Sequence, residues 1–539
     1  MGLQEMPKVT DLGDGRKFWS ADFGSFRAKV YVQKQQELAD IVNFGYLAPY
    51  ILIFEEREMT PEEAIAFSDK EGYSAIAEGA SGSVVFIYPA SEKGWEDAPE
   101  TLFADVIANS RIHQYFRDGI VTSKDRFTGK WGENYIRGAI FRTAVYGFGA
   151  SADHIARHLL KTVNGQFLWG PGEITPACVI LERLSVTPAP ERRDIPVVSA
   201  SNSAEVNDAL QSACDHLLIK DVPEPEKDFR DFVWKYKRWV GILQENPDLE
   251  AMGLVQEPGA ITVQTSPDNA GDDAGTEKHR IGYVAYYNRD LADAKALPTL
   301  LAFHGGGDSA FYIAYESGWY RIAHKYGFLL ISVENHLNST ATEMMELIDL
   351  LKEKYPIDET RLYASGFSMG GCKSWDLYQE YPERFAALAP MDATFEVGLN
   401  VYGQPAPKAY NRTVPVPLFY AGGEETPLPE LPFQAEKCWD RIRYVFEVNR
   451  LKTPYTAKFE ERESWENRIW GISGDQVEKT YDETRDSTLT VHYFRDETGA
   501  VTTALASVSG QGHECRPHTC EAAWNFMKQF TRSAGAGRS

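Results

Sequence analysis

Short apolar runs alternate with longer segments of helical spacing along the second half of the chain. In order, these segments are residues 298–303 (apolar), 319–326 (helical), 328–333 (apolar), 343–354 (helical), 361–365 (apolar) and 372–381 (helical). Short buried strands that alternate with helices form a mostly parallel sheet covered on both faces. The pattern therefore predicts an α/β fold for this half of the protein.

The first half resembles a degenerate copy of the second, and 539 residues are too many for one hydrophobic core. Four segments match in the same order: residues 47–55 with 296–304, 142–150 with 361–369, 195–200 with 416–421, and 232–239 with 523–530. Such an ordered set is typical of a duplicated domain, although an unrelated accessory α/β domain is the alternative. We predict a domain at 1–245, a polar, glycine-rich linker or loop at 246–279, and a second domain at 280–539.

Charge and composition limit which molecules the protein is expected to bind and in which compartment it is expected to occur. The chain has 55 Lys and Arg against 78 Asp and Glu, a formal net charge of −23, which disfavours binding to nucleic acid or to an anionic membrane surface. No apolar run approaches the roughly 18–20 residues that span a bilayer. The first residues lack the basic and then apolar pattern of a secretion signal, and six scattered cysteines fit a reducing compartment. We expect a cytoplasmic protein, with secretion open if a signal was removed.

The candidate nucleophile is Ser368, in the run Gly366-Phe367-Ser368-Met369-Gly370-Gly371. This run fits the pattern G-x-S-x-G, and it stands between a predicted strand and a predicted helix. A strand that turns abruptly into a helix strains the backbone at the serine, so its neighbours must be small. The alternative is a tight turn with a passive serine.

The candidate base is a histidine, because a serine hydroxyl needs a group that accepts its proton. Three histidines follow Ser368: His492 in an alternating, strand-like run, then His513 and His518. His513 follows the flexible run at 509–512 and precedes the last predicted helix, at 521–530. We therefore predict that His513 is the base.

The same region holds four potential zinc ligands, His513, Cys515, His518 and Cys520. Structural zinc sites usually draw two ligands from each of two separated segments, so we predict no metal here. A disulfide between Cys515 and Cys520 stays open, and packing near the loop is the favoured role for both thiols.

The candidate acid follows the strand-like run at 417–421, where Gly422 and Gly423 precede Glu424 and Glu425. A carboxylate there would hold the imidazole in one tautomer and stabilise its protonated form. The spacing from Gly422 favours Glu425. Glu424 and Asp392 are the alternative candidates for the acid. If Glu424 and Glu425 have no catalytic role, they are simply solvated carboxylates of a loop.

A run of glycines completes the predicted site. His304-Gly305-Gly306-Gly307 follows a strand, and backbone N–H groups there can approach an oxyanion without an intervening side chain. We predict that the N–H groups of Gly306 and Met369 bind the oxyanion, with His304 and Gly305 in the same binding loop. A phosphate-binding loop is the rival, but the Lys-Ser/Thr pair of that motif is missing.

Residues from about 280 to 533 resemble α/β-hydrolases of the polyhydroxybutyrate depolymerase and feruloyl esterase type. The resemblance rests on the segments 304–307, 317–328, 355–363 running into the Ser368 turn, 381–386 and 512–513. It implies a serine hydrolase fold with a catalytic triad and no cofactor, although relatives mostly carry Asp where we place Glu425. Relatives cleave polyesters, feruloyl esters and acetyl esters, and distant ones cleave peptides.

The matched positions in the first half lack the residues that this reaction needs. Gly149 stands where Ser368 stands, Glu55 and Glu56 replace His304 and Gly305, and Ala204 falls near the acid. No histidine occurs at 219–225, where a base would belong. We predict a non-catalytic lobe that serves in packing, in dimerisation or as a roof over the active site.

These residues together predict a serine carboxylic-ester hydrolase that acts through an acyl-enzyme, on a small-molecule or oligomeric ester. A peptidase or amidase with the same triad is one alternative, and a non-catalytic binding or scaffold protein is another. A homo-oligomer formed through the first domain is also expected. Trp319, Tyr320 and Trp375 could shape a substrate pocket or belong to the core. The segments 400–413 and 427–475 are the expected rim of the site.

Overall fold

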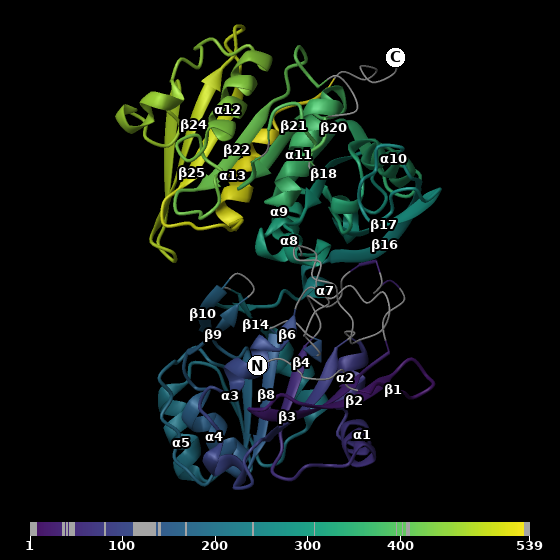
Figure 1. Cartoon of the computed structure of the whole chain (residues 1–539), viewed down its shortest axis with the longest axis vertical. Coiled ribbons are helices and arrows are strands. Elements are labelled where there is room, and N and C mark those ends of the chain that lie inside the picture. The colour runs from purple at the N-terminus through teal and green to yellow at the C-terminus, as the bar shows by residue number, and fades with distance from the viewer. Residues whose placement is uncertain are drawn as a thin grey trace. The chain divides into compact units, whose positions relative to one another are not determined.

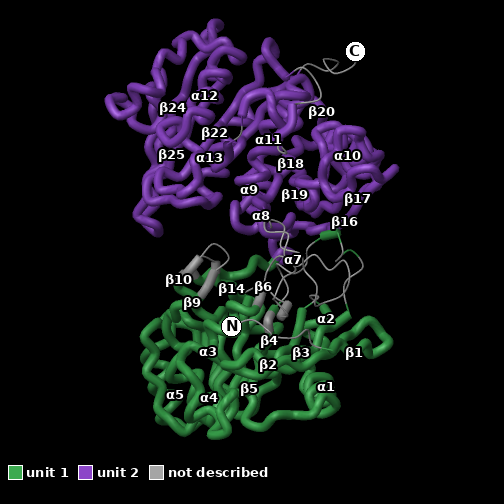
Figure 2. The backbone as a smooth tube through the Cα atoms, viewed as in Figure 1, with its two compact units in different colours: residues 1–248 green, residues 249–539 purple. Residues whose placement is uncertain are grey.

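The computed structural model of the chain describes residues 8–532, except 35–37, 39–40, 43–48, 80–81, 112–135, 138–141, 168–169, 240–241, 307, 395, 401–402 and 406–409. The chain divides into two compact units, Met1–Asp248 and Leu249–Ser539 (Figure 2). Each unit has a large twisted sheet with helices packed against it (Figure 1). The predicted α/β fold class is therefore confirmed. No helix in these described ranges has the length and apolar character needed to cross a bilayer.

Unit 2 contains a ten-stranded sheet in the order β16-β17-β19-β18-β20-β21-β22-β25-β24-β23. Its strands are β16 (Leu254–Gln264), β17 (Lys278–Asn288), β18 (Leu297–Phe303), β19 (Leu329–Val333), β20 (Ile357–Phe367), β21 (Ala387–Met391), β22 (Leu418–Gly423), β23 (Gln476–Asp482), β24 (Ser487–Arg495) and β25 (Val501–Val508). The six strands from β19 to β25 in this order are parallel, and antiparallel strands extend both edges. The predicted mostly parallel sheet is present.

Helices of unit 2 begin and end where the sequence provides local signals. They are α7 (Leu249–Met252), α8 (Ala310–Glu316), α9 (Trp319–Tyr326), α10 (Ala341–Leu351), α11 (Met369–Glu380), α12 (Glu436–Val448) and α13 (Pro517–Met527). Thr340 and Glu343 form a capping box that starts α10 by satisfying backbone N–H groups. Gly327, at φ 68°, ends α9 in a left-handed conformation that glycine adopts without strain.

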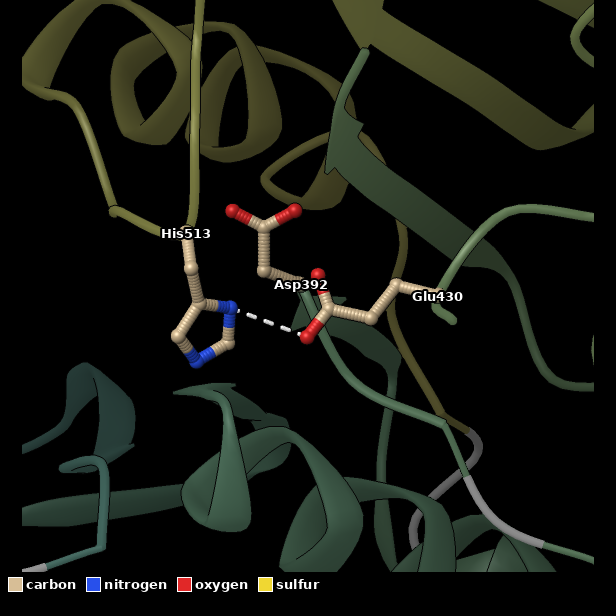
Figure 3. Close-up of side chains that lie close together, drawn as sticks. All are labelled: Asp392, Glu430 and His513. Carbon is tan, nitrogen blue, oxygen red and sulfur yellow. Dashed lines mark ion pairs between the residues drawn. The ribbon is translucent and has the colours of Figure 1, made fainter. Parts of the chain in front are cut away.

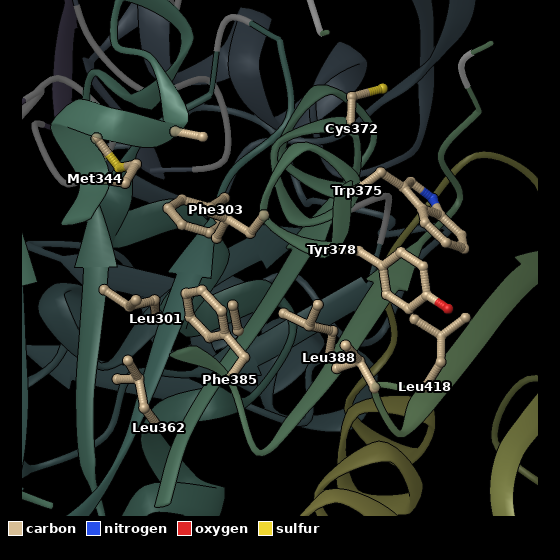
Figure 4. Close-up of a cluster of buried hydrophobic side chains, with 14 of the residues drawn as sticks. Leu301, Phe303, Met344, Leu362, Cys372, Trp375, Tyr378, Phe385, Leu388 and Leu418 are labelled. Carbon is tan, nitrogen blue, oxygen red and sulfur yellow. The ribbon is translucent and has the colours of Figure 1, made fainter. Parts of the chain in front are cut away.

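One large hydrophobic core connects α10, α11 and α12 with the parallel strands (Figure 4). Leu301 and Phe303 of β18 belong to this core, together with Trp375 and Tyr378 of α11. Ala302 lies between these two β18 residues and is also fully buried, although successive strand residues point to opposite faces of the sheet. The sheet is therefore buried on both faces, which explains the continuous apolar runs in the sequence.

Unit 1 contains a nine-stranded sheet in the order β1-β2-β3-β5-β4-β8-β11-β12-β13. Its strands are β1 (Thr10–Asp11), β2 (Lys17–Asp22), β3 (Phe26–Val32), β4 (Tyr50–Phe54), β5 (Ser83–Pro89), β8 (Thr143–Phe148), β11 (Cys178–Glu182), β12 (Val197–Ala200) and β13 (Leu217–Lys220). Three strand pairs lie outside it: β6 (Ser110–Arg111) with β7 (Ile136–Arg137), β9 (Val163–Phe167) with β10 (Gly170–Ile174), and β14 (Tyr236–Trp239) with β15 (Ile242–Glu245).

Helices cover both faces of the unit 1 sheet, and each face has its own core. The helices are α1 (Pro61–Lys70), α2 (Tyr73–Gly79), α3 (Leu102–Ala108), α4 (Ala150–His158), α5 (Ala204–Ala213) and α6 (Pro225–Asp231). Residues of α3, α4 and α5 pack with Leu52 and Phe54 of β4. Residues of α1, α2 and α6 pack with Ile51 and Ile53 of the same strand. This alternation along β4 shows the two-residue period of a fully buried strand.

The two sheets share one topology. The order β2-β3-β5-β4-β8-β11-β12-β13 in unit 1 corresponds strand by strand to β16-β17-β19-β18-β20-β21-β22-β25 in unit 2. Every corresponding pair has the same sense: the first two pairings are antiparallel and the other five are parallel. Three of the four matched segments reach equivalent strands, namely β4 with β18, β8 with β20, and β12 with β22, although residues 47–48 lie outside the described residues.

The fourth segment match is wrong. Residues 523–530 lie in and just after α13, whereas 232–239 pass from a short 3-10 helix, Val233–Lys235, into β14. The helix that follows the last parallel strand of unit 1 is α6, and both α6 and α13 begin with a proline in the first turn. The resemblance between the two segments came from similar aromatic spacing and not from equivalent positions.

The predicted linker at 246–279 is also wrong in part. It contains all of β16, which pairs with β17 along eleven residues, so unit 2 begins at Leu249. Only the polar run near 265–275 forms a loop, and Asn269 in it donates to the Glu343 carboxylate of α10. Because β16 is an edge strand with many half-buried residues, its sequence lacks the apolar run that reveals the central strands.

Candidate active site

Ser368 is the single residue between β20 and α11, and its backbone is strained. Its φ of 53° and ψ of −120° lie in a region that residues other than glycine rarely adopt. The Ser368 N–H donates to Met391 O over 3.0 Å, which ties the turn to the neighbouring strand β21. The predicted strand–serine–helix turn is present, and it lifts the Ser368 side chain above the carboxyl end of the sheet.

The glycines around Ser368 are needed because other backbone atoms lie against them. A Cβ atom on Gly366 would lie 2.1 Å from Gly370 O, and a Cβ on Gly370 would lie 2.2 Å from Phe303 O. Both distances are far below van der Waals contact, and backbone atoms cannot move aside easily. The two glycines of the motif therefore allow three backbone segments to meet at the serine.

Gly370→Ala is expected to lower the free energy of unfolding of unit 2 by about 3 kcal/mol, because the new methyl group overlaps the carbonyl of Phe303. Urea denaturation followed by tryptophan fluorescence measures the change. Gly79→Ala in α2 is the control, since nothing lies within 4 Å of its added Cβ. An unfolding midpoint of Gly370→Ala equal to that of wild type would contradict the close approach.

His513 reaches Ser368 from the loop between β25 and α13. Its Nε2 lies 2.8 Å from Ser368 Oγ, although 145 positions separate the two residues. Burial lowers the pKa of His513, against the opposing charges of Asp392 and Asp308. The imidazole is therefore neutral near neutral pH, and its Nε2 can accept the serine proton while Nδ1 carries the other.

The carboxylate beside His513 is that of Glu430 and not the predicted Glu425 (Figure 3). Glu430 Oε1 lies 2.9 Å from His513 Nδ1, and the Glu430 side chain is 2% exposed. No well-aligned hydrogen bond joins Nδ1 to Oε1, and the contact becomes an ion pair only when His513 is protonated. Such contacts often become aligned only when substrate binds.

Glu425 is exposed, and the path of the chain after β22 explains the error. The Glu425 N–H donates to Gln511 O over 2.9 Å. The next five residues, which include two prolines, bring Glu430 back beneath the histidine loop. The alternative Glu424 also lies elsewhere, since its Oε1 accepts a hydrogen bond from Ser507 Oγ over 2.6 Å. No spacing rule in the sequence singles out Glu430.

Asp392, the third candidate acid, lies in the same cluster as Glu430 and His513 (Figure 3). It directly follows β21 and is 1% exposed, and ligand-type atoms of the three residues lie within 4.8 Å of one another. Within the described ranges no other three His, Cys, Asp or Glu residues meet in this way. A cation on Nδ1 would leave the neutral imidazole with a proton on Nε2, which could not then accept the serine proton. The contact with Ser368 therefore fits proton transfer better than metal binding.

The glycine loop after β18 lies against the start of α11. A Cβ on Gly370 would lie 2.6 Å from His304 O, so the start of the loop meets the second residue of that helix, next to Met369. The N–H groups at a helix start attract negative charge, as the oxyanion prediction requires. Gly307 lies outside the described residues.

His304 belongs to this loop but does not face a substrate. Its side chain is 1% exposed, and its Nδ1 lies 2.7 Å from Gly305 O. Nε2 contacts Glu334 O, and His336 Nε2 donates to His304 O over 2.9 Å. The His304 side chain therefore holds in place the loop in which it was predicted to lie.

Other predicted candidates belong to the interior. Trp319, Tyr320 and Trp375 are at most 1% exposed and pack in the core. His492 lies in β24, where its Nδ1 accepts from Gly474 N over 3.1 Å. The sulfur atoms of Cys515 and Cys520 are 3.4 Å apart, so both are free thiols. His518 lies near Asp482, and the four residues proposed as an alternative zinc site do not converge.

The equivalent turn in unit 1 has the same backbone conformation, but different side chains lie around it. Gly149 has a φ of 57° and a ψ of −122°, close to the values of Ser368. The Ala150 N–H, which corresponds to that of Met369, donates to Glu56 Oε1 over 2.7 Å. A Cβ on Gly149 would lie 2.4 Å from the same oxygen. The Glu56 carboxylate therefore occupies the space where a nucleophile and an oxyanion would meet.

Comparisons with known proteins add the following. No family model matches the chain. A bifunctional acetylxylan esterase/xylanase of Neocallimastix patriciarum is 30% identical over 135 residues, which cover 23% of this chain and 19% of that protein. This chain thus spans about a fifth of the length of the curated relative it matches.

Many solved structures resemble part of the chain, and two of them serve as examples. An S-formylglutathione hydrolase of Staphylococcus aureus is 14% identical with a TM-score of 0.30, covering 51% of this chain and 98% of that one. An acetyl xylan esterase of Aspergillus awamori is 11% identical with a TM-score of 0.33, covering 50% of this chain and 98% of that one.

Proposed function

We propose that the protein is a serine carboxylic-ester hydrolase whose active site is in unit 2. One observation carries this proposal: a strained Ser368 hydroxyl lies 2.8 Å from His513 Nε2, and the other ring nitrogen faces the buried Glu430 carboxylate. A serine, a histidine and a carboxylate in this order activate a hydroxyl for attack on an acyl carbon. The strand order of unit 2 and the turn at Ser368 are those of α/β-hydrolases, which supports the same reaction class.

The reaction would proceed through an acyl-enzyme. Ser368 Oγ attacks the carbonyl carbon of the ester while its proton passes to His513 Nε2. The imidazolium returns that proton to the departing alkoxide, which leaves as the alcohol. Water then attacks the acyl group, gives a proton to His513, and releases the carboxylic acid as Ser368 regains its hydrogen. Glu430 stabilises the positive charge that His513 carries between these steps.

The oxyanion of each tetrahedral intermediate needs hydrogen-bond donors at close range. We assign this role to the backbone N–H groups of Met369 and Gly306, because the glycine loop lies against the start of α11. Donors held in place before the reaction stabilise the developing charge without reorganisation. His304 supports them through its contacts with backbone carbonyls.

Unit 1 would take no part in the chemistry. Gly149 lacks a nucleophile, the Glu56 carboxylate fills the adjacent space, and residues 221–224 between β13 and α6 contain no histidine. A carboxylate at this point would also repel an oxyanion. The shared topology supports a duplicated hydrolase fold that has lost its active site.

Short acyl esters are the first substrates to test, since the curated relative is an acetylxylan esterase/xylanase. We expect the purified protein to hydrolyse p-nitrophenyl acetate and to release acetate from acetylated xylan. We expect faster turnover of the ester than of the matching p-nitroanilide, and covalent labelling by a fluorophosphonate probe at Ser368. Absence of both labelling and ester hydrolysis would contradict the proposed function.

A further inference from the structure

Asp392 lies where three loops at the carboxyl end of the unit 2 sheet meet (Figure 3). It directly follows β21, whereas Glu430 is in the loop after β22 and His513 is in the loop after β25. These three strands are neighbours in the sheet, in the order β21-β22-β25. The Asp392 side chain is buried between the loop of the proposed acid and the loop of the proposed base.

The Asp392 carboxyl group accepts hydrogen bonds from both of these loops. Gly423, the last residue of β22, donates its N–H to Asp392 Oδ1 over 2.6 Å. Oδ2 accepts from Gln511 Nε2 over 3.2 Å and from Glu514 N over 3.3 Å. Gln511 and Glu514 lie on opposite sides of His513 in the chain. One carboxyl group therefore contacts the start of the acid loop and both sides of the base.

The three partners are all N–H donors, so both Asp392 oxygens act as acceptors in these contacts. N–H donors favour the charged form of a carboxyl group. Burial raises the pKa of Asp392, and the N–H bond from Gly423 lowers it. Removing an acceptor from a buried site leaves its donors without a partner, which costs more than the bond itself contributes. The two loops therefore depend on an acceptor at this position.

The backbone that carries Asp392 is itself held in place. The Asp392 N–H donates to Ala421 O of β22 over 2.8 Å. The next carbonyl, Ala393 O, accepts from Tyr420 Oη over 2.7 Å and from Arg441 Nη1 over 2.9 Å. The carboxyl group thus extends from a fixed point of the sheet and can determine where the two loops lie.

The histidine loop needs such an anchor because its own packing is loose. Nothing lies within 4 Å of a Cβ added to Gly512, the residue before His513. The Glu425 N–H also donates to Gln511 O over 2.9 Å, so a backbone contact joins the two loops directly. His513 Nε2 must nevertheless stay within hydrogen-bond distance of Ser368 Oγ, and small displacements of a catalytic group are costly.

We propose that Asp392 is a positioning residue that anchors the loop of His513 to the start of the loop of Glu430. This inference rests on the proposed function of Ser368 and His513. Asp392 touches no reacting atom. It acts through the backbone on both sides of His513, and it keeps the base at the distance from Ser368 at which the proton can be transferred.

The first test is Asp392→Asn. Asparagine has nearly the same size and tolerates the φ of 41° that Asp392 adopts, so the backbone need not change. Its NH2 group, however, cannot accept from the donors that Oδ2 now serves. We expect kcat for p-nitrophenyl acetate to fall about 10–100-fold and KM to stay within about twofold, because the base moves while the substrate site does not. Unchanged kcat would overturn the inference.

The assay conditions and the control separate this effect from the ionisation of Glu430. Burial raises the pKa of Glu430 to about 8, so the assays are run about one pH unit higher, where Glu430 is charged. The control is Glu424→Gln in the same loop, whose carboxylate accepts from Ser507 Oγ. A hydroxyl can donate or accept, so this variant should stay within about twofold of wild type.

A donor–acceptor exchange tests the contact itself. Gln511→Glu places a carboxylate against Asp392 and should lower kcat about tenfold. In the double variant with Asp392→Asn, the asparagine amide can donate to the new carboxylate. The double variant should therefore be at least as active as Asp392→Asn alone, whereas independent losses would multiply. Multiplied losses would show that Asp392 acts in another way, for example as the acid of the triad.

Hydrogen exchange of the backbone reads the anchor without using activity. The Glu514 N–H donates to Asp392, so a peptide covering residues 509–516 should exchange about fivefold faster or more in Asp392→Asn than in wild type. Equal exchange rates would overturn the inference. If exchange rose as expected but wild type showed neither ester hydrolysis nor fluorophosphonate labelling, the proposed function would fail while the role of Asp392 in the loop stood.

Discussion

Ser368→Ala is expected to lower kcat for p-nitrophenyl acetate by about 10⁴–10⁶-fold, because the variant has no nucleophile and the remaining groups act only on bound substrate. Single-turnover and steady-state assays measure the loss, and fluorophosphonate labelling should disappear from the whole chain. Disappearance is expected from the whole chain because unit 1 has Gly149 at the equivalent position. Turnover close to that of wild type would rule out the proposed mechanism.

Ser368→Gly separates chemistry from backbone strain. A glycine at φ 53° is unstrained, so this variant should be as inactive as Ser368→Ala but more stable than it by about 1 kcal/mol. Thermal unfolding of both variants measures the difference. The same conformation is held by Gly149 in unit 1, which is consistent with relief of strain once the nucleophile is absent. Equal stabilities would show that the turn stores no strain at this residue.

Glu430→Gln is expected to lower kcat by about 10³–10⁴-fold, the second largest effect, because the imidazolium then forms beside a neutral amide that can also favour the wrong tautomer. The matched control is Glu425→Gln in the same loop. Glu425 is exposed, so its amide variant should stay within about twofold of wild type. Steady-state kinetics at a pH above the Glu430 ionisation, with circular dichroism to confirm folding, measures both.

A larger loss of activity in Glu425→Gln than in Glu430→Gln would change the assignment of the triad acid. If Glu425→Gln lost activity and Glu430→Gln kept it, the loop between β22 and α12 would have to move when substrate binds. If neither variant lost activity, Asp392 would be the carboxyl group left beside His513. The triad would then contain an aspartate.

Unit 1 has the sheet framework of unit 2 without the groups to which we assign the chemistry. Its sheet keeps the strand order of unit 2, and Gly149 keeps the unusual backbone of the turn. The differences are local: unit 1 has Gly149 where unit 2 has Ser368, and the Glu56 carboxylate accepts from the Ala150 N–H, which corresponds to that of Met369. A fold maintained by two hydrophobic cores does not depend on these few residues.

The central strands, the helices around them, the turn at Ser368 and the choice of His513 could all be predicted from sequence patterns. Each of these depends on short-range rules. Apolar runs bounded by turns give buried strands, and close backbone packing at a turn requires glycines such as Gly366 and Gly370. The histidine was identified because only three histidines follow the serine and His513 directly follows the flexible run at 509–512.

The carboxyl partner of that histidine and the extent of unit 2 could be recognised only from the folded chain. Glu430 and Asp392 come from loops after different strands, and nothing in their local sequence distinguishes a buried carboxyl from a solvated one. Likewise β16 is defined by its pairing with β17 and not by an apolar run. Contacts between residues far apart in the chain depend on the path of whole loops and on which strands pair. Short sequence patterns predict neither of these.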